Sequence, residues 1–173
     1  KGIDIERKLK INFIPLNISN YQDVDEVFLN IKPDVIIHAA ASKYVDLSEK
    51  FISETIDTNI NGSKNIFVCA KKHKCKKVIV ISSDKASPPF TGLYALSKAT
   101  MERSLINLNA KKKIDLNIVR FGNLSWSTGS VLNLWDEMKT KKLIKTTGPE
   151  MTRFFYSIHK ATKLIELLIE KKN

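Results

Sequence analysis

Short, uninterrupted apolar runs alternate with longer amphipathic segments along this chain of 173 residues. Residues 34–40 contain the run Val-Ile-Ile-His-Ala-Ala, and residues 77–83 contain Val-Ile-Val-Ile. Neither run shows the polar alternation of a strand with one face in water, so both are typical of strands covered by helices on both faces. A third apolar run covers residues 116–121. The pattern predicts an α/β fold in which helices flank a parallel sheet.

Apolar residues recur every three or four positions between these runs, as they do on one face of a helix. This spacing predicts helices over residues 23–31, 51–72, 93–109, 130–141 and 158–171. Residues 11–16 are a further strand candidate that precedes the first of these helices. No repeat or linker divides the chain, so we expect one domain over residues 1–173.

The sequence contains no glycine-rich turn. Dinucleotide-binding domains open with a strand, a turn such as G-x-G-x-x-G, and a helix whose first amides hold the pyrophosphate. No such motif occurs here. We therefore interpret the chain as a partial, Rossmann-like domain that lacks this first Gly-rich strand, turn and helix.

The formal net charge of +11 comes almost entirely from lysine. The lysines gather at the edges of predicted elements without interleaved aromatic residues, which favours solvated surfaces over a nucleic-acid interface. Attraction of a phosphorylated substrate is the functional alternative. No apolar run is long enough for a membrane span, and the first residues lack the apolar block of a signal peptide, so we expect a cytoplasmic protein. Cys69 and Cys75 are expected to be reduced, and no cluster of ligands predicts a metal site.

Polar residues that could carry chemistry follow the second apolar run. Ser82, Ser83, Asp84 and Lys85 come at its carboxyl end, where open α/β sheets bind their ligands. Tyr94 and Lys98 lie four residues apart at the start of the next predicted helix, so both project from one helical face. An ammonium near a phenol favours the ionised phenol. We therefore expect Lys98 to lower the pKa of Tyr94 and make it a usable base for a sugar hydroxyl.

The Y-x-x-x-K spacing is a weak signal by itself, because lysine is so abundant in this chain. Tyr156 and Lys160 have the same spacing but follow no buried strand with hydroxyl residues at its end. Position therefore favours Tyr94, with an ordinary surface tyrosine as the alternative.

Several ordered motifs resemble bacterial UDP-N-acetylglucosamine 4,6-dehydratases, in the polysaccharide-biosynthesis branch of the extended short-chain dehydrogenases. Residues 38–45, His-Ala-Ala-Ala-Ser-Lys-Tyr-Val, resemble the segment H-A-A-A-x-K-x-V. Residues 82–86 resemble S-T-D-K-A, and residues 93–98 resemble L-Y-G-A-T-K. The remaining matches are Thr-Asn-Ile-Asn-Gly at 58–62, Val-Arg-Phe-Gly-Asn at 119–123, Gly-Ser-Val at 129–131 and Met-Thr-Arg-Phe at 151–154.

This resemblance implies a catalytic cycle on a UDP-sugar. In the family, a bound NAD or NADP takes hydride from C4, water leaves from C6, and the hydride returns to C6. The resemblance implies that Tyr94 and Lys98 act at C4, that Lys85 is the base at C5, and that Asp84 is the acid for the C6 hydroxyl. It implies a partial NAD(P)-binding domain, a UDP-sugar as partner and a homo-oligomer.

Further binding residues are assigned through the same resemblance. The candidates for cofactor binding, besides Tyr94 and Lys98, are Ala39, Ala40, Ala41, Asn59 and Ser82. The candidates for substrate binding are Lys43, Ser83, Asn123 and Arg153. His38 is interpreted as a buried strand residue rather than a catalyst.

The sequence also departs from the family pattern. The usual G-S-R-G-S reads Ser-Trp-Ser-Thr-Gly-Ser at 125–130 and so loses its arginine. Three alternatives therefore stay open: another nucleotide-sugar epimerase or reductase, an inactive nucleotide-binding or interaction remnant, and, for Asp84 and Lys85 alone, a solvent-exposed turn pair.

Overall fold

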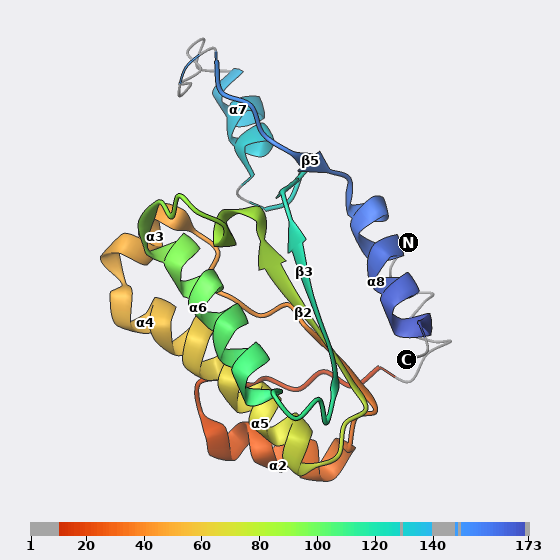
Figure 1. Cartoon of the computed structure of the whole chain (residues 1–173). Coiled ribbons are helices and arrows are strands. Elements are labelled where there is room, and N and C mark those ends of the chain that lie inside the picture. The colour runs from red at the N-terminus through yellow and green to blue at the C-terminus, as the bar shows by residue number, and fades with distance from the viewer. Residues whose placement is uncertain (1–10, 129, 140–147, 149, 172–173) are drawn as a thin grey trace.

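A three-stranded parallel sheet forms the centre of the computed structural model, which describes residues 11–128, 130–139, 148 and 150–171. The strands are β1 (Val35–His38), β2 (Lys77–Ser83) and β3 (Asp115–Phe121), in the order β1-β2-β3. Their register aligns Val35 with Lys77, and Lys77 with Asp115. All three strands therefore end at the same edge of the sheet (Figure 1). The predicted α/β fold with a parallel sheet is confirmed.

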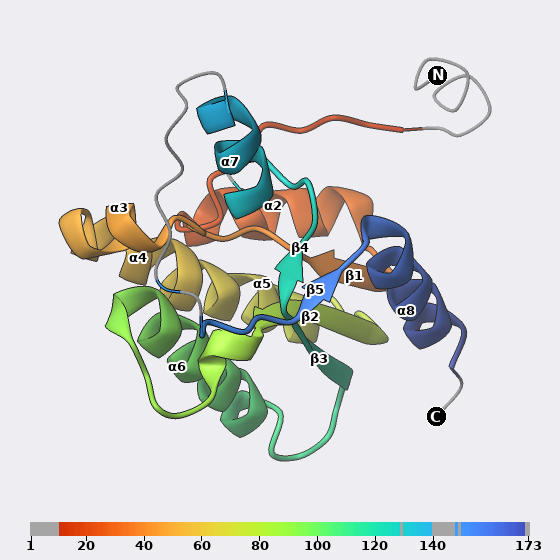
Figure 2. The ribbon, with the colours of Figure 1, turned by 90° about the horizontal axis from the view of Figure 1, so that it is seen from above.

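Helices cover the two faces of the sheet unequally (Figures 1 and 2). One face carries α2, α5 and α6, and the opposite face carries α8. The helices of the described chain are α2 (Tyr21–Ile31), α3 (Val45–Lys50), α4 (Ile52–Ile56), α5 (Ser63–Lys72), α6 (Gly92–Leu108), α7 (Val131–Lys139) and α8 (Ile158–Glu170). None of the helices in the described ranges is both long and apolar enough to cross a membrane.

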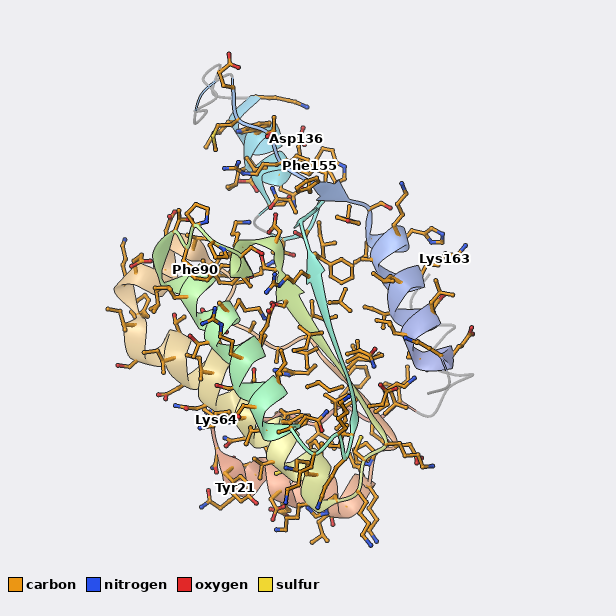
Figure 3. The ribbon with its side chains drawn as sticks, in the orientation of Figure 1. Tyr21, Lys64, Phe90, Asp136, Phe155 and Lys163 are labelled. Carbon is orange, nitrogen blue, oxygen red and sulfur yellow. The ribbon has the colours of Figure 1, made fainter. Side chains whose placement is uncertain are left out.

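The main core lies between the sheet and the layer of α2, α5 and α6. Val78 and Val80 of β2 point into it and meet Phe67 of α5 and Leu105 of α6, all of them almost completely buried. Alternate strand residues face opposite sides, so Ile79 faces the other side, toward α8. Lys64 and Lys163 are exposed on α5 and α8 (Figure 3), whereas Lys77 and Lys98 are buried.

Two sequence-based predictions of elements differ from the structure. Residues 11–16 form no strand, and Phe13 is 79% exposed. An apolar run becomes a strand only beside another strand, and among the described strands β1 pairs with β2 alone. The predicted helix 51–72 is interrupted by a π-helical segment, η1 (Asp57–Gly62), between α4 and α5. Such segments are rare and occur frequently at functional sites.

A second, two-stranded sheet stands above the carboxyl edge of the first. Its strands, β4 (Asn123–Leu124) and β5 (Phe155–Tyr156), pair in parallel. Gly122 brings the chain so close to this sheet that a Cβ there would lie 2.6 Å from the Phe154 carbonyl oxygen. The glycine thus permits the close backbone approach that turns the chain from β3 into β4.

A buried lysine fixes α8 to the main sheet. Lys77 Nζ donates hydrogen bonds to the carbonyl oxygens of Leu168 (2.6 Å), Ile169 (3.2 Å) and Lys171 (2.6 Å). The same ammonium lies 3.2 Å from Asp115 Oδ2, and both side chains are at most 15% exposed. A cation at the carbonyl end of a helix is favourable because it complements the helix dipole.

We expect Lys77→Met to lower the free energy of unfolding by about 3–5 kcal/mol, since it leaves a buried carboxylate and several helix-end carbonyls without their cation. Urea denaturation measures this loss. Lys76→Met is the matched control, because Lys76 pairs with Asp34 where both side chains are more than 70% exposed. That exposed pair should contribute less than about 1 kcal/mol. Equal losses for the two variants would contradict the role of Lys77.

Candidate active site

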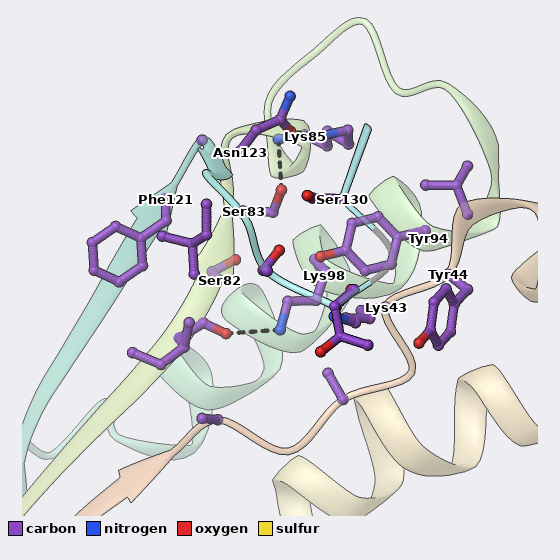
Figure 4. Close-up of a pocket in the computed structure, with 18 of the residues that line it drawn as sticks. Lys43, Tyr44, Ser82, Ser83, Lys85, Tyr94, Lys98, Phe121, Asn123 and Ser130 are labelled. Atoms are coloured by element: carbon purple, nitrogen blue, oxygen red, sulfur yellow. Dashed lines mark hydrogen bonds between the residues drawn. The ribbon is translucent and has the colours of Figure 1, made fainter. Parts of the chain in front are cut away.

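A cavity of about 490 Å³ opens at the carboxyl edge of the main sheet (Figure 4). Its walls come from the ends of β2 and β3, the loop after β1, the start of α6 and the segment between β4 and α7. Most of the residues predicted from the sequence line it: Ala39, Ala41, Lys43, Ser82, Ser83, Lys85, Tyr94, Lys98 and Asn123. The topology therefore gathers residues that are far apart in the sequence around one space.

Tyr94 lies in the first turn of α6, and a carboxylate on α3 fixes that turn. Glu49 Oε1 accepts a hydrogen bond from the Leu93 amide at 2.5 Å. Gly92 has a φ of +79°, and a Cβ there would meet the same carboxylate oxygen at 2.6 Å. The positive φ favours glycine at this position, and the Glu49 side chain occupies the space beside it. A carboxylate at a helix N-terminus is favourable, so Glu49 stabilises the turn that presents Tyr94.

Lys98 is buried beneath the cavity, one helical turn from Tyr94 (Figure 4). Its Nζ donates a hydrogen bond to the Ile81 carbonyl oxygen at 2.7 Å. Burial lowers the pKa of Lys98 from 10.5 to about 8, although the nearby Glu102 carboxylate opposes this change. A lysine ammonium has three protons, so the bond to Ile81 leaves donor capacity for a bound ligand.

The Tyr94 phenol is less acidic than the sequence predicts. Burial raises its pKa above the ordinary value, contact with Ser83 opposes this rise, and the charge of Asp84 adds to it. Lys98 was expected to lower this pKa, but in the structure its ammonium is directed to the Ile81 carbonyl. The phenol is therefore protonated in this structure near neutral pH.

Asp84 and Lys85 form a short turn, η2 (Asp84–Ala86), at the end of β2. The Ser83 hydroxyl caps the turn: its Oγ accepts from the Lys85 amide at 3.2 Å and donates to Asp84 Oδ1 at 3.0 Å. Lys85 Nζ lies 3.6 Å from Asp84 Oδ1 and 3.4 Å from Asn123 Oδ1. Both charged side chains are about one-third exposed. Lys85 lines the cavity, whereas Asp84, its neighbour in the chain, is not among the lining residues.

The cavity floor combines small side chains with a buried hydroxyl. Ser82 Oγ is buried and has no hydrogen-bond partner within the described ranges. Ala39 and Ala41 line the cavity, whereas Ala40, predicted with them, does not. Successive residues of an extended segment point in opposite directions, which explains the difference. A buried hydroxyl of this kind is a ready contact for a polar ligand.

Asn59 does not line the cavity but supports the backbone of the loop after β1, which does. Its amide exchanges two hydrogen bonds with the Ser42 backbone, at 2.8 and 3.0 Å, and donates to Ser97 Oγ at 3.0 Å. Ser97 Oγ donates in turn to the Tyr94 carbonyl at 2.8 Å. These contacts engage the fully buried Asn59 amide, and Asn59 does not line the cavity, so the structure does not bring it to the predicted cofactor site.

His38 is a buried strand residue, as predicted. Ser63 Oγ donates its single proton to the Asn59 carbonyl at 2.7 Å, so His38 Nε2 must donate to Ser63 Oγ, also at 2.7 Å. Burial lowers the pKa of His38 to about 4, and the charge of Lys98 adds to this effect. The imidazole is therefore neutral and serves the same buried network as Asn59.

The two remaining predicted residues have different outcomes. Lys43 spans the cavity mouth and donates to the Thr128 carbonyl at 2.6 Å. Arg153 is exposed, donates to the Thr152 carbonyl at 2.7 Å, and is not brought into the cavity. Tyr156, in the competing Tyr-Lys spacing, lies in β5 outside the cavity lining and packs edge-on against Phe121.

Three charged residues that contact the elements around the site, but do not line the cavity, were not predicted from the sequence: Glu49, Glu102 and Arg120. Glu102 follows Lys98 by four positions, so the spacing that relates Tyr94 to Lys98 continues to Glu102 on the same face of α6. Extending the pattern by one turn would have identified it. Glu49 carries no comparable signal, because its contact depends on how α3 packs against α6.

The depressed pKa of Lys98 makes a prediction about stability and pH. Between pH 8 and 10.5 the unfolded chain binds more protons than the folded chain at this site, so stability should rise with pH through this window, by up to about 1.4 kcal/mol per pH unit. Below pH 8 the Lys98 ammonium is charged in both the folded and the unfolded chain, so the full free-energy cost of burying the charge opposes folding. Urea denaturation of the wild type and Lys98→Met across this window isolates the effect. A constant difference between the two proteins would contradict it.

Comparison with known proteins assigns the family. Residues 3–172 match the family model described as polysaccharide biosynthesis protein. The chain belongs to this family. Among curated members with similar sequences, the UDP-glucose 4-epimerase of Rickettsia bellii is 37% identical over 160 residues, which are 90% of this chain and 46% of that protein. The corresponding epimerase of Rickettsia canadensis is 36% identical. The chain thus spans about half the length of these relatives.

Solved structures confirm the Rossmann-like fold of this polysaccharide biosynthesis family member. Pen from Bacillus thuringiensis is 32% identical, with a TM-score of 0.84 over 99% of this chain and 57% of Pen. The UDP-glucose 4-epimerase of Thermotoga maritima, solved with UDP-glucose, is 20% identical, with a TM-score of 0.83 over 92% of this chain and 59% of that one. The predicted polysaccharide-biosynthesis branch is therefore confirmed. The narrower prediction of a 4,6-dehydratase goes beyond these matches.

Proposed function

We propose that this family member is a nucleotide-sugar 4,6-dehydratase whose substrate is UDP-N-acetylglucosamine. The observation that carries the proposal is the position of Asp84 and Lys85 beside the cavity that Tyr94 and Lys98 line. Oxidation at C4 of a sugar needs one base. Loss of water across C5 and C6 needs a second base and an acid, and Lys85 and Asp84 supply both.

The site fits a nicotinamide dinucleotide, NAD or NADP. Ser82 offers a buried hydroxyl that has no partner among the described residues, Ala39 and Ala41 leave room for a ring, and Lys98 retains ammonium protons for a ribose hydroxyl. A structure of the Thermus thermophilus UDP-glucose 4-epimerase, which shares this fold, contains NAD. When bound, the oxidised cofactor supplies a hydride acceptor and a positive charge, and that charge favours ionisation of the neighbouring phenol.

The proposed proton transfers follow the order of the chemical steps at C4, C5 and C6 of the sugar. Tyr94 takes the proton of the C4 hydroxyl as that carbon is oxidised, with Lys98 holding the reacting groups in place. The resulting ketone acidifies the C5 proton. Once the Lys85 ammonium has passed a proton to the Asp84 carboxylate, 3.6 Å away, the neutral amine of Lys85 removes the C5 proton. Asp84 donates a proton to the C6 hydroxyl, which leaves as water. A bound nicotinamide would hold the hydride taken from C4 and supply it to C6, while a proton is added at C5.

A UDP-sugar 4-epimerase is the second candidate, because the curated relatives quoted above carry that name. Epimerisation removes and returns hydride at C4 alone. It can be served by Tyr94 and Lys98 and assigns no chemistry to Asp84 and Lys85. The turn at the end of β2 is thus the feature that favours dehydration over epimerisation.

The test is to incubate the protein with UDP-N-acetylglucosamine and either cofactor in deuterated water. We expect a product that has lost one water, carries a 4-keto group and has deuterium at C5. A C4 epimer of unchanged mass, without deuterium on carbon, would contradict dehydration and favour the second candidate. Calorimetry with NADP and with UDP supplies a control for binding, because an inactive remnant would produce heat with neither ligand.

A further inference from the structure

Arg120 on β3 forms a three-way junction behind the cavity. Its Nε donates to Glu102 Oε1 at 2.9 Å, and its Nη2 donates to Glu102 Oε2 at 2.5 Å. Its Nη1 donates to Ser87 Oγ at 2.7 Å. The guanidinium thus binds the Glu102 carboxylate through Nε and Nη2 and the Ser87 hydroxyl through Nη1.

The two partners of Arg120 belong to the two elements that carry the proposed catalytic residues. Glu102 lies one turn beyond Lys98 on α6, the helix that also presents Tyr94. Ser87 directly follows the η2 turn, and its amide donates to the Asp84 carbonyl at 3.3 Å. One side chain therefore joins the Tyr94 helix to the Asp84 turn.

The junction joins a strand of the main sheet to a buried carboxylate, and the Arg120 side chain itself is 44% exposed. Arg120 pairs with Ser82 in the register of β3 with β2, so its backbone cannot shift without disturbing the sheet. The Glu102 side chain is only 7% exposed, and a buried carboxylate requires a charged partner. The guanidinium is planar and holds its donors at fixed angles. The fixed geometry of the guanidinium therefore sets the distance between Glu102 and Ser87.

We propose that Arg120 is a positioning residue that sets the separation between the Asp84–Lys85 pair and the Tyr94–Lys98 pair. This inference rests on the proposed dehydration, in which both pairs act on adjacent carbons of one sugar. Tyr94 must reach the C4 hydroxyl while Lys85 reaches the C5 proton. A misplacement of about 1 Å costs on the order of 10²-fold in rate, so a fixed spacer between the pairs is valuable.

Two substitutions separate positioning from stability. Ser87→Ala removes the hydroxyl arm and leaves the ion pair of Arg120 with Glu102 in place. Arg120→Lys keeps the positive charge beside Glu102 but removes the fork. We expect each variant to lower kcat for dehydration by roughly 10-fold to 10²-fold, with KM for the UDP-sugar and the thermal midpoint of Ser87→Ala unchanged. Ser53→Ala, at an exposed position on α4, is the matched control and should behave as the wild type.

A second readout does not depend on activity. Amide hydrogen exchange over residues 84–88 should become roughly 10-fold faster in Ser87→Ala and Arg120→Lys, and stay unchanged in Ser53→Ala, because an untethered turn opens more often. Unchanged exchange, or a wild-type kcat in Ser87→Ala, would overturn the inference. If the wild type performs no dehydration, the proposed function fails, but the exchange measurement still decides whether Arg120 holds the turn.

Discussion

Replacing Tyr94 with phenylalanine is expected to lower kcat by about 10²–10⁴-fold, the range by which a positioned acid or base accelerates a reaction. The substitution removes one hydroxyl from a buried ring in the first turn of α6 and leaves the packing in place. Since the phenol acts on the reacting C4 hydroxyl, KM for the sugar nucleotide should change little. Steady-state rates of 4-keto product formation measure the loss.

Tyr156→Phe is the matched control for this experiment. Tyr156 precedes a lysine by the same four positions, but it lies in β5 and does not line the cavity. Its ring packs edge-on against Phe121, which does line the cavity. We expect nearly wild-type rates from this variant. Comparable losses of kcat from Tyr94→Phe and Tyr156→Phe would contradict the assignment of Tyr94, at the carboxyl edge of the sheet, as the reacting tyrosine.

The second large effect is expected at the turn after β2. Lys85→Met and Asp84→Asn should each lower formation of the dehydrated product by about 10²–10⁴-fold, because each removes one partner of the proton transfers at C5 and C6. Oxidation at C4 uses Tyr94 and should survive. A 4-keto sugar that keeps its C6 oxygen is therefore expected in Lys85→Met, in at most stoichiometric amount, and mass spectrometry of the bound sugar would detect it.

Lys64→Met controls for the loss of a positive charge, since Lys64 is exposed on α5, away from the cavity lining (Figure 3). It should leave both the rate and the product unchanged. If Lys85→Met dehydrates the sugar at the wild-type rate, Asp84 and Lys85 form only a solvent-exposed turn pair, and their assigned roles at C5 and C6 are wrong.

The parts of the fold that depend on local pattern could be predicted from the sequence. The apolar runs at β1, β2 and β3 were identified because strands buried on both faces contain few polar residues. Tyr94, Lys98, Ser83 and Lys85 were identified because ligands bind at the carboxyl ends of parallel strands. These are consequences of the chain's own periodicity.

The parts that depend on distant partners could not be predicted in this way. Residues 11–16 have the composition of a strand, but among the described residues no neighbouring strand pairs with them. The Lys98 ammonium was expected to lower the pKa of Tyr94, but it donates a hydrogen bond to the Ile81 carbonyl, 17 positions away. Arg153 was expected at the substrate because of its motif, and the fold leaves it exposed. Each outcome is decided by tertiary contacts that no local pattern records.

The most direct test of the central claim follows a deuterium atom placed on C4 of UDP-N-acetylglucosamine. If Tyr94 and Lys98 act at C4 while Asp84 and Lys85 expel water across C5 and C6, the deuterium should be found on C6 of the product. Nuclear magnetic resonance of the isolated product locates it. Deuterium that remains on C4, in an epimer that keeps its C6 hydroxyl, would contradict the account.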